Sequence, residues 1–328
     1  MRGPGAPPPV SSTDLSTVEP RQARRRAQWL GVLCLCVGVA TFSLQDIVIK
    51  MTAGTYPVHQ VMVIRSLAAA PLLLLLVHME AGVRSLVTPR ARMLALRGTA
   101  LIVSYGAYYL AFPAMPLAAA VSLWFVAPLA ITAIAGIMLG ERIGFGRWVA
   151  VAVGFAGVLV ILRPGAGVMD AAAILPVAAA VTYAVAQVLA RRLGVTERAS
   201  VMGFYQNGAF FVGAVILSLV FGTGAFAGSS HPSMAFLTRA WAVPDWIDLL
   251  LLGACGPIAA LGVFLLSNAY RLAEASRVAP FEYTGLIWGV LWGYVVWAEI
   301  PAWTTLAGVA LLLGAGLYVM RSRDGAEA

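Results

Sequence analysis

Charged residues are scarce in this chain. Asp, Glu, Lys and Arg make up 11% of the 328 residues, whereas hydrophobic residues make up 61%. A soluble globular domain is typically about 25% charged, so the composition excludes an ordinary soluble fold. Apolar runs of about 20 residues recur along the sequence, and this is the length that an α-helix needs to cross a bilayer. The runs are continuous rather than alternating, which excludes a transmembrane β-barrel. We therefore expect an all-α polytopic membrane protein.

The sequence also lacks the motifs of several functional classes. It contains no phosphate-binding Walker loop, no H-E-x-x-H and no G-x-S-x-G. The three cysteines cannot form a disulfide framework, and Cys34 and Cys36 lie inside the first apolar run, where packing explains them better than metal binding. An intramembrane enzyme would need nucleophile and base groups clustered at one depth, which the sequence does not show. We expect no enzymatic activity, no cofactor and no metal.

The net charge of +8 does not indicate a nucleic-acid partner. Basic residues cluster in short segments between the apolar runs, as the positive-inside rule describes for membrane proteins. With the N-terminus inside, the inner segments hold most arginines, including Arg84, Arg97 and Arg271, whereas the outer segments hold only Arg163 and Arg239. This asymmetry predicts that both termini lie on the cytoplasmic side of an inner (plasma) membrane.

The apolar runs divide the chain into ten expected spans. They cover about 29–51, 58–79, 93–112, 116–138, 146–162, 170–190, 200–222, 246–270, 277–298 and 302–320. Residues 1–28 are rich in Pro, Ser and Thr and have few large apolar residues, so we expect a disordered cytoplasmic tail there. Residues 322–328 form a C-terminal tail.

Two stretches of the sequence resemble each other. "AFPAMPLAAAVSLWFVAPLAITAIAGIMLGERI" (111–143) and "AYRLAEASRVAPFEYTGLIWGVLWGYVVWAEIP" (269–301) both end in an acidic residue after a long apolar run. A constant offset of 158 pairs Ala111 with Ala269, Glu141 with Glu299, and Arg163 with Arg321. Each half would then hold five spans. Because five is odd, the second half would be inverted in the membrane, which is a common transporter design.

The same segments carry a resemblance to a known family. They include "LGER" (139–142), "GFAGVLVILRPG" (154–165), "APFEYTGLIWGVLWGYVVWAEIP" (279–301) and "GVALLLGAG" (308–316). With these motifs the chain resembles the drug/metabolite transporter superfamily, with EamA-type repeats at 29–163 and 170–321. The resemblance implies a ten-helix bundle around a central cavity formed largely by helices 1–4 and 6–9.

Charged residues inside the spans are the first candidates for function, because charges at membrane depth are costly and usually face protein or water. Asp46 and Lys50 are one helical turn apart, so an ion pair between them is one arrangement that the spacing allows. Lys50, the only lysine of the chain, lies near the outer end of its helix and can also reach the interface. Arg65 lies at about the depth of Asp46, which allows an Asp46–Arg65 pair instead.

Glu282 is the corresponding candidate in the second half. Gly285, Gly289 and Gly293 follow it at intervals of four, and such a stripe lets another helix approach closely. At 100° per residue Glu282 falls close to this stripe, so it should face protein. Two interpretations remain open: a packing acid bonded to Arg271 or Arg277, and a functional acid that is either a protonatable gate or a ligand for a cationic substrate.

The repeat predicts two polar layers. Offsets of 141 and 158 pair Asp46 with Gln187, Arg65 with Gln206, and Trp124 with Glu282. Asp46, Arg65 and Trp124 would form an outer layer. The inner layer would consist of Gln187, Gln206, Asn207 and Glu282. Aromatic residues within the spans, some of which would line the cavity, are Tyr105, Tyr108, Tyr109, Trp124, Tyr183, Tyr205, Tyr283, Trp288 and Trp292.

These patterns favour a secondary active transporter that moves a small organic metabolite by alternating access. Asp46 or Glu282 would couple transport to protons, and without such coupling the chain would be a passive facilitator or exchanger. A non-transporting membrane scaffold is the alternative from another class, with the loop at 223–245 as its contact surface. The expected partners are a small-molecule metabolite and the lipid bilayer.

Overall fold

A computed structural model describes residues 12–139, 145–162, 171–193, 196–273 and 278–321. Within these ranges all regular structure is helical, which confirms the all-α prediction. The α-helices are α1 (Ser12–Thr52), α2 (Val58–Glu80), α3 (Ala91–Ala111), α4 (Leu117–Trp124), α5 (Ala127–Leu139), α6 (Phe145–Leu162), α7 (Ile174–Leu193), α8 (Ala199–Phe221), α9 (Pro232–Thr238), α10 (Trp246–Leu272), α12 (Thr284–Trp297) and α13 (Trp303–Arg321). Short 3-10 helices are η1 (Val83–Leu86), η2 (Phe112–Ala114), η3 (Ala171–Ala173) and η4 (Ala279–Tyr283).

Helices long and apolar enough to cross a membrane occur in both halves of the chain. There are five among the described residues: Arg26–Thr52, Val58–Glu80, Leu117–Ile134, Ala199–Phe221 and Trp246–Leu272. Shorter apolar helices cover Trp148–Ile161, Ile174–Ala190 and Trp303–Ala315. The chain is therefore a multi-pass membrane protein, whereas the count of ten spans stays a prediction.

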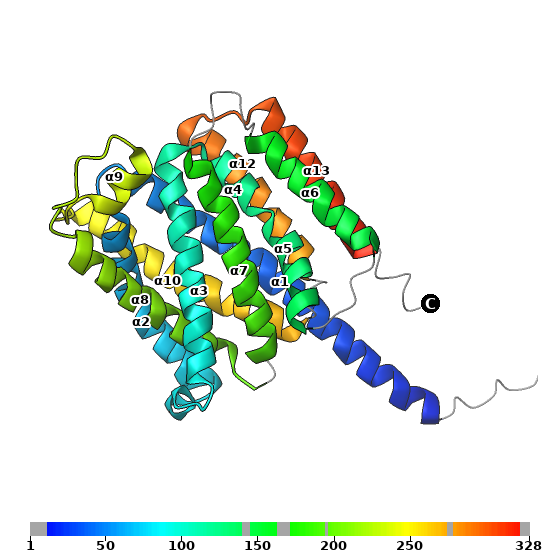
Figure 1. Ribbon diagram of the computed structural model, residues 1–328. Coiled ribbons are helices and arrows are strands. Elements are labelled where there is room, and N and C mark those ends of the chain that lie inside the picture. Colours follow the sequence, from blue (N-terminus) through cyan, green and yellow to red (C-terminus); the bar gives the residue numbers. More distant parts are fainter. Residues whose placement is uncertain (1–11, 140–144, 163–170, 194–195, 274–277, 322–328) are drawn as a thin grey trace, which may run out of the picture.

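The helices differ from the expected spans at two places. The fourth span is broken between α4 and α5, because the ring of Pro128 would clash with the carbonyl of Trp124, four residues earlier, in a continuous helix. α1 begins at Ser12 rather than near residue 29, so residues 12–28 are helical and not disordered. The Ala, Arg and Gln residues that precede the apolar run are good helix formers. Figure 1 shows this part of α1 extending away from the bundle.

The helices pack in pairs that join the two halves of the chain. α1 packs along α10 and α3 along α7, while α2 contacts α8 and α6 contacts α13 (Figure 1). Suppose that each expected span is replaced by its counterpart in the other half, so that the first exchanges with the sixth, the second with the seventh, and so on. The α1–α10 pair, spans 1 and 8, then becomes spans 6 and 3, which is the α7–α3 pair. The same exchange leaves the other two pairs unchanged. Two equivalent five-helix halves would pack in this way, although Glu141 and Arg163, two residues of the expected repeat, lie outside the described residues.

Close backbone contact defines the α6–α13 pair. A Cβ atom on Gly157 would lie 2.8 Å from the carbonyl oxygen of Gly308, and one on Gly308 would lie 2.5 Å from the carbonyl oxygen of Gly157. Both distances are too short for a side chain, so the two helices need glycine at this crossing.

Replacing Gly157 should therefore destabilise the protein. We expect Gly157→Val to cost about 1–3 kcal/mol, as overpacking usually does, and to lower the thermal unfolding midpoint in detergent. Gly314→Val is the matched control, because a Cβ there meets no atom within 4 Å. Equal midpoints for the two variants would contradict the close crossing.

Candidate functional site

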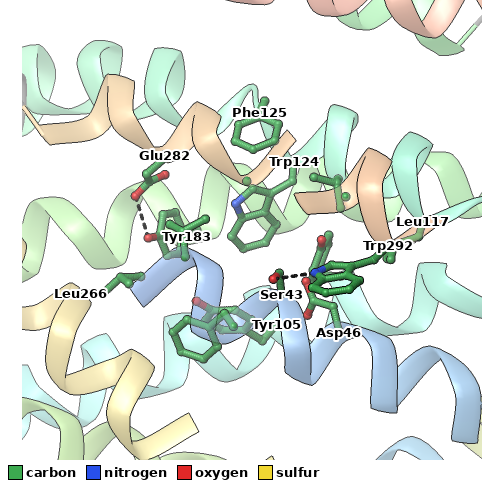
Figure 2. Close-up of a pocket in the computed structure, with 16 residues that line it drawn as sticks. Ser43, Asp46, Tyr105, Leu117, Trp124, Phe125, Tyr183, Leu266, Glu282 and Trp292 are labelled. Atoms are coloured by element: carbon green, nitrogen blue, oxygen red, sulfur yellow. Dashed lines mark hydrogen bonds between the residues drawn. The ribbon is translucent and has the colours of Figure 1, made fainter. Parts of the chain in front are cut away.

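A cavity of about 80 Å³ lies at the centre of the bundle (Figure 2). Its wall is formed by α1, α3, α4, α7, α10, η4 and α12, so both halves of the chain contribute. Seven aromatic side chains line it: Phe42, Tyr105, Tyr108, Trp124, Phe125, Tyr183 and Trp292. Two carboxyl groups, those of Asp46 and Glu282, supply the charged atoms of the wall. This volume accommodates a few water molecules, so a metabolite requires the cavity to widen.

Glu282 faces the cavity from η4 and is held by hydroxyl groups. Its Oε1 accepts a hydrogen bond of 2.9 Å from Tyr183 Oη and another from Tyr270 Oη. The residue is 4% exposed. The packing alternative named Arg271 as its partner, but Arg271 bonds Glu80 instead, and Arg277 lies outside the described residues. Glu282 is therefore a buried acid whose recorded partners are neutral donors from two other helices.

Asp46 enters the same cavity from α1. Tyr108 of α3 lines the cavity together with it. One turn earlier, Ser43 Oγ accepts a hydrogen bond of 3.0 Å from Trp292 Nε1. Figure 2 shows Asp46 and Glu282 on different sides of the cavity, with Trp124 and Tyr105 between them. The structure thus brings Asp46, Trp124 and Glu282 together at one cavity, whereas the other predicted members of the two polar layers do not line it.

Tyr105 is the centre of the aromatic wall. Its ring centroid lies 5.6 Å from that of Trp124, 5.7 Å from Phe210 and 6.2 Å from Tyr183. Trp124 in turn lies 5.0 Å from Tyr183. Ring contacts of this kind prefer offset or edge-on geometry, and they bury large apolar surfaces. The wall of the cavity is therefore largely aromatic and apolar.

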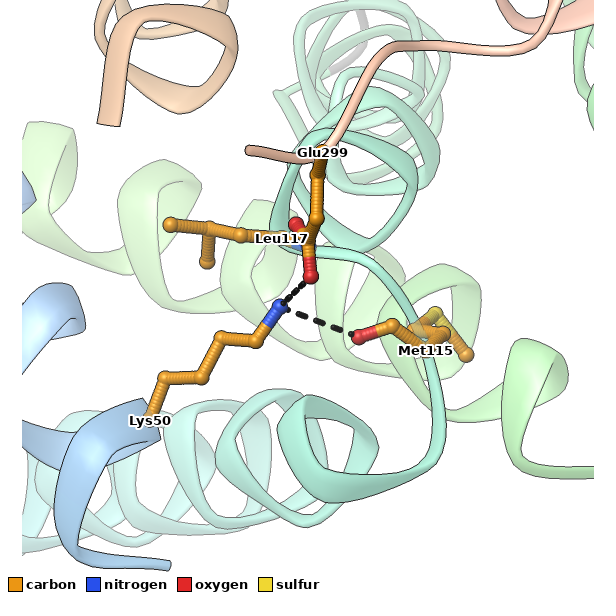
Figure 3. A network of polar contacts seen from close by, with 4 residues as sticks. All are labelled: Lys50, Met115, Leu117 and Glu299. Carbon is orange, nitrogen blue, oxygen red and sulfur yellow. Dashed lines mark hydrogen bonds and ion pairs between the residues drawn. The ribbon is translucent and has the colours of Figure 1, made fainter. Parts of the chain in front are cut away.

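An ion pair that the sequence did not predict lies at one side of the cavity. Lys50 Nζ lies 2.5 Å from Glu299 Oε1 (Figure 3). Glu299 Oε2 accepts a 2.9 Å hydrogen bond from the backbone N–H of Leu117, at the start of α4. The ammonium also lies 4.7 Å from the ring of Trp297, a cation–π distance. The contact joins α1, α4 and the end of α12, directly beyond the cavity residue Leu117.

This contact corrects the expected pairing of Lys50. Within the part of the chain that the structure describes, Lys50 is joined by a salt bridge to Glu299 and not to Asp46. The backbone explains the difference. Ala298 ends α12 in the left-handed conformation, with φ 54°, and this turn directs Glu299 back toward α4 and α1. In the sequence, the feature that pointed to Glu299 was its match with Glu141 at the offset of 158.

A similar arrangement closes the opposite end of the bundle. Glu80, the last residue of α2, lies with its Oε1 3.0 Å from Arg271 Nη1. Its Oε2 accepts a 2.9 Å hydrogen bond from the backbone N–H of Ser200, at the start of α8. At both ends a carboxylate therefore meets a cation and the N-terminus of a helix, where backbone N–H groups lack helical partners.

Arg65 lies outside the cavity, behind its wall. Arg65 Nε donates a 2.8 Å hydrogen bond to Gln45 Oε1, and Gln45 Nε2 donates to Tyr109 Oη. The guanidinium also lies 4.7 Å from the ring of Phe210. The expected direct Asp46–Arg65 bridge is not present among the described residues: Arg65 Nε is bonded to the Gln45 amide, and the buried Nη1 has no hydrogen-bond partner.

The remaining predicted polar residues are buried elsewhere. Asn207 Nδ2 donates to the carbonyl of Ser66 at 3.0 Å, and Gln187 is 3% exposed away from the cavity wall. Gln206 Oε1 accepts from Arg97 Nη1 at 3.4 Å. Arg97 had been assigned to an inner segment but is 3% exposed within α3. Arg97 lies four residues inside the expected span 93–112, and this position already indicated a place within the helix rather than in the loop before it.

The glycine stripe of α12 packs on protein. Cβ atoms on Gly285 and Gly289 would lie 3.1 Å from Phe125 and 2.9 Å from Val121, and both glycines line the cavity. Gly293 lies next to Glu299. Tyr283 is buried and packs against Phe125 in a tilted arrangement, with ring centroids 5.3 Å apart, so it supports the wall from behind.

The Lys50–Glu299 pair should contribute measurably to stability. Its side chains are only 9% and 21% exposed, so Glu299→Gln leaves a poorly hydrated ammonium without its anion. We expect a loss of about 1–3 kcal/mol, between the values for surface and buried pairs. Adding Lys50→Met to Glu299→Gln should recover part of it in a thermal unfolding experiment. Strictly additive losses would mean that the two side chains are not coupled.

Comparisons with known proteins agree with this architecture. A riboflavin transporter of Rhizobium johnstonii is 31% identical over 64% of this chain, which spans just under two thirds (63%) of that protein. An S-adenosylmethionine uptake transporter of Rickettsia prowazekii is 24% identical over 89% of this chain and 92% of its own. A pseudopaline exporter of Pseudomonas aeruginosa is 27% identical, with coverages of 90% and 97%. These relatives are named as transporters, in agreement with the expectation of a non-enzyme.

A solved crystal structure superposes on the chain with a TM-score of 0.62 and 17% identity. The superposition covers 93% of this chain and 99% of the other, and it shows the fold alone. Residues 29–163 match the EamA-like transporter family. The match of residues 29–163, the named relatives and the helical bundle support membership of the drug/metabolite transporter superfamily.

Proposed function

We propose that this chain is a secondary active transporter that moves a small organic metabolite across the inner (plasma) membrane by alternating access. The observation that carries the proposal is the meeting of Asp46 and Glu282, from the two halves of the chain, at one central cavity. Both carboxyl groups are placed where a substrate would sit and where a proton can bind. The arginine distribution supports cytoplasmic termini.

The packing supports two inverted repeats, 29–163 and 170–321. The inter-half helix pairs exchange in the way that such repeats require. The two closures lie at opposite ends of the bundle, Lys50–Glu299 at the expected outer end and Arg271–Glu80 at the expected inner end. Opening one closure while the other holds would expose the cavity to one side at a time, which is the essence of alternating access.

The wall of the cavity indicates the chemistry of the substrate. Aromatic rings favour a planar group, and rings together with carboxylates favour a positively charged one. Of the described residues that line the cavity, Asp46 and Glu282 carry acidic groups and none is Lys or Arg. We therefore propose a substrate with a flat ring system and a cationic group. Riboflavin and S-adenosylmethionine, named for the relatives, are the first compounds to test for transport.

Transport assays in proteoliposomes test the roles of the two acids. A neutral amide at either position keeps the shape of the side chain but cannot exchange a proton. We expect Asp46→Asn or Glu282→Gln to lower proton-driven uphill uptake at least tenfold while leaving substrate exchange measurable. Asp245→Asn is the matched control, because it removes an exposed carboxylate from the N-cap of α10 and Asn caps a helix equally well.

Two outcomes would correct the proposal. Flux that is unchanged in both acid variants would exclude proton coupling and leave a facilitator or exchanger. Absence of flux for every tested metabolite under any gradient would count against transport and favour the scaffold.

The outer closure should control access to the cavity from outside. In a chain with Cys34, Cys36 and Cys255 replaced by Ser, a Ser43→Cys variant should react slowly with a membrane-impermeant maleimide added outside. Glu299→Gln should speed this labelling several-fold, because it removes the anion that holds Lys50. Arg271→Gln, which loosens the other closure, should slow it or leave it unchanged. Equal acceleration by both variants would contradict separate closures.

A further inference from the structure

A second, larger hollow lies on the surface of the bundle, away from the central cavity. It is an open groove of about 690 Å³ between α3 and α8. Ala95, Thr99 and Ile102 contribute from α3, and Gly208, Val212 and Ile216 from α8. Val212 and Ile216 are 57% and 55% exposed. In a membrane protein such a surface faces acyl chains, so the groove is a natural seat for lipid.

Glycines shape the groove. α3 and α8 are in close contact at two glycines. A Cβ atom on Gly98 would lie 2.7 Å from Ala209, and a Cβ atom on Gly213 would lie 2.2 Å from Ile102. Beside this contact line, a Cβ on Gly208 would meet no atom within 4 Å, which leaves the hollow open. From residue 204 to residue 216 the groove follows α8 for about 18 Å. That length is close to one leaflet, half of the roughly 30 Å hydrocarbon core.

One end of the groove is strongly basic. Arg92 precedes Ala95 by three residues and Thr99 by seven, so it lies on the same face of α3 as the groove. Arg198, the N-cap of α8, precedes the groove residue Tyr205 by seven. These two arginines are exposed, as are Arg84 and Arg90 in the preceding segment.

The charges at this end remain available for a ligand. Among the described residues, Arg84, Arg90, Arg92 and Arg198 take part in no recorded salt bridge or side-chain hydrogen bond. The nearby acid Glu197 has its Oε1 occupied by Thr88 Oγ1 at 2.7 Å. Tyr205 Oη donates to the carbonyl of Leu86 at 2.8 Å and fixes the basic segment against α8.

We propose that the α3–α8 groove binds an anionic phospholipid, with one acyl chain in the groove and the phosphate at Arg92 and its neighbouring arginines. Apolar length, open volume and positive charge at one end match such a lipid in a single leaflet. Arginine suits a phosphate because its planar guanidinium forms paired hydrogen bonds. The leaflet is the cytoplasmic one if the charge-based orientation holds. This site is separate from the transport cavity and does not depend on the substrate.

Native mass spectrometry of the full chain in detergent tests the proposal. Dioleoyl phosphatidylglycerol and dioleoyl phosphatidylcholine share their acyl chains and differ in headgroup charge. We expect the wild-type chain to retain the phosphatidylglycerol several-fold more. Arg92→Gln should lower this preference about fivefold, the effect of one arginine near an anionic surface. Gly208→Leu should lower the retention of both lipids, because its side chain fills the groove.

Matched controls separate the site from general effects. Arg26→Gln removes an exposed arginine from α1, which Figure 1 shows leaving the bundle away from α3 and α8. Gly253→Leu adds the same side chain where a Cβ on α10 meets no atom within 4 Å. Both controls should bind lipid like the wild type.

Three results would overturn the proposal. They are equal retention of the two lipids by the wild type, an Arg26→Gln effect as large as that of Arg92→Gln, and full release of phosphatidylglycerol by millimolar inorganic phosphate. The last result would mean that the arginines bind free anions and that the groove contributes nothing. Retention that falls in Gly208→Leu but not in Gly253→Leu supports the proposal even where an arginine variant is poorly expressed.

Discussion

A membrane interior offers no water to satisfy buried polar groups, so every such group must find its partner within the protein. Glu282 illustrates the consequence, because its carboxylate is bonded by tyrosines of α7 and α10 while it lies on η4. One acid thereby ties three elements of the second half together. The same tyrosine layer, through Tyr105 and Trp124, reaches the side of the cavity that holds Asp46. The hydrogen bonds that satisfy Glu282 therefore also hold a side chain, Tyr183, that shapes the cavity.

The two closures show how ionic contacts can hold the ends of the bundle while its centre contains a cavity. Each uses one carboxylate to hold a cation and to cap a helix, α4 at one end and α8 at the other. Such charge-assisted contacts are strong for their size but depend on exact geometry. In each closure both bonds share one carboxylate, so a movement of the end of α12, which carries Glu299, or of α2, which carries Glu80, would break both bonds together.

Sequence reasoning recovered the elements and part of the site. Apolar run length located the helices, and the cost of charge at membrane depth singled out Asp46 and Glu282, which line the cavity with Trp124. Helical spacing failed for Lys50, because it reports only neighbours on one helix, whereas Glu299 arrives from 249 residues away through the left-handed turn at Ala298. The depth argument put Arg65 level with Asp46, but depth does not reveal that its Nε bonds Gln45 and that neither residue lines the cavity. The break at Pro128 was readable from the sequence.

Lys50 has a chemical consequence beyond its ion pair. Apart from the α-amino group, it carries the only primary amine of the chain, and that amine is engaged with a carboxylate and an indole at the rim of the cavity. Acylating reagents attack free amines far faster than engaged ammonium groups. Lys50 Nζ is therefore the single side-chain amine open to acylation, and its reactivity would report whether the contact with Glu299 is formed. Reductive methylation, followed by isotope-edited spectroscopy, would turn the same atom into a spectroscopic label without any engineered residue.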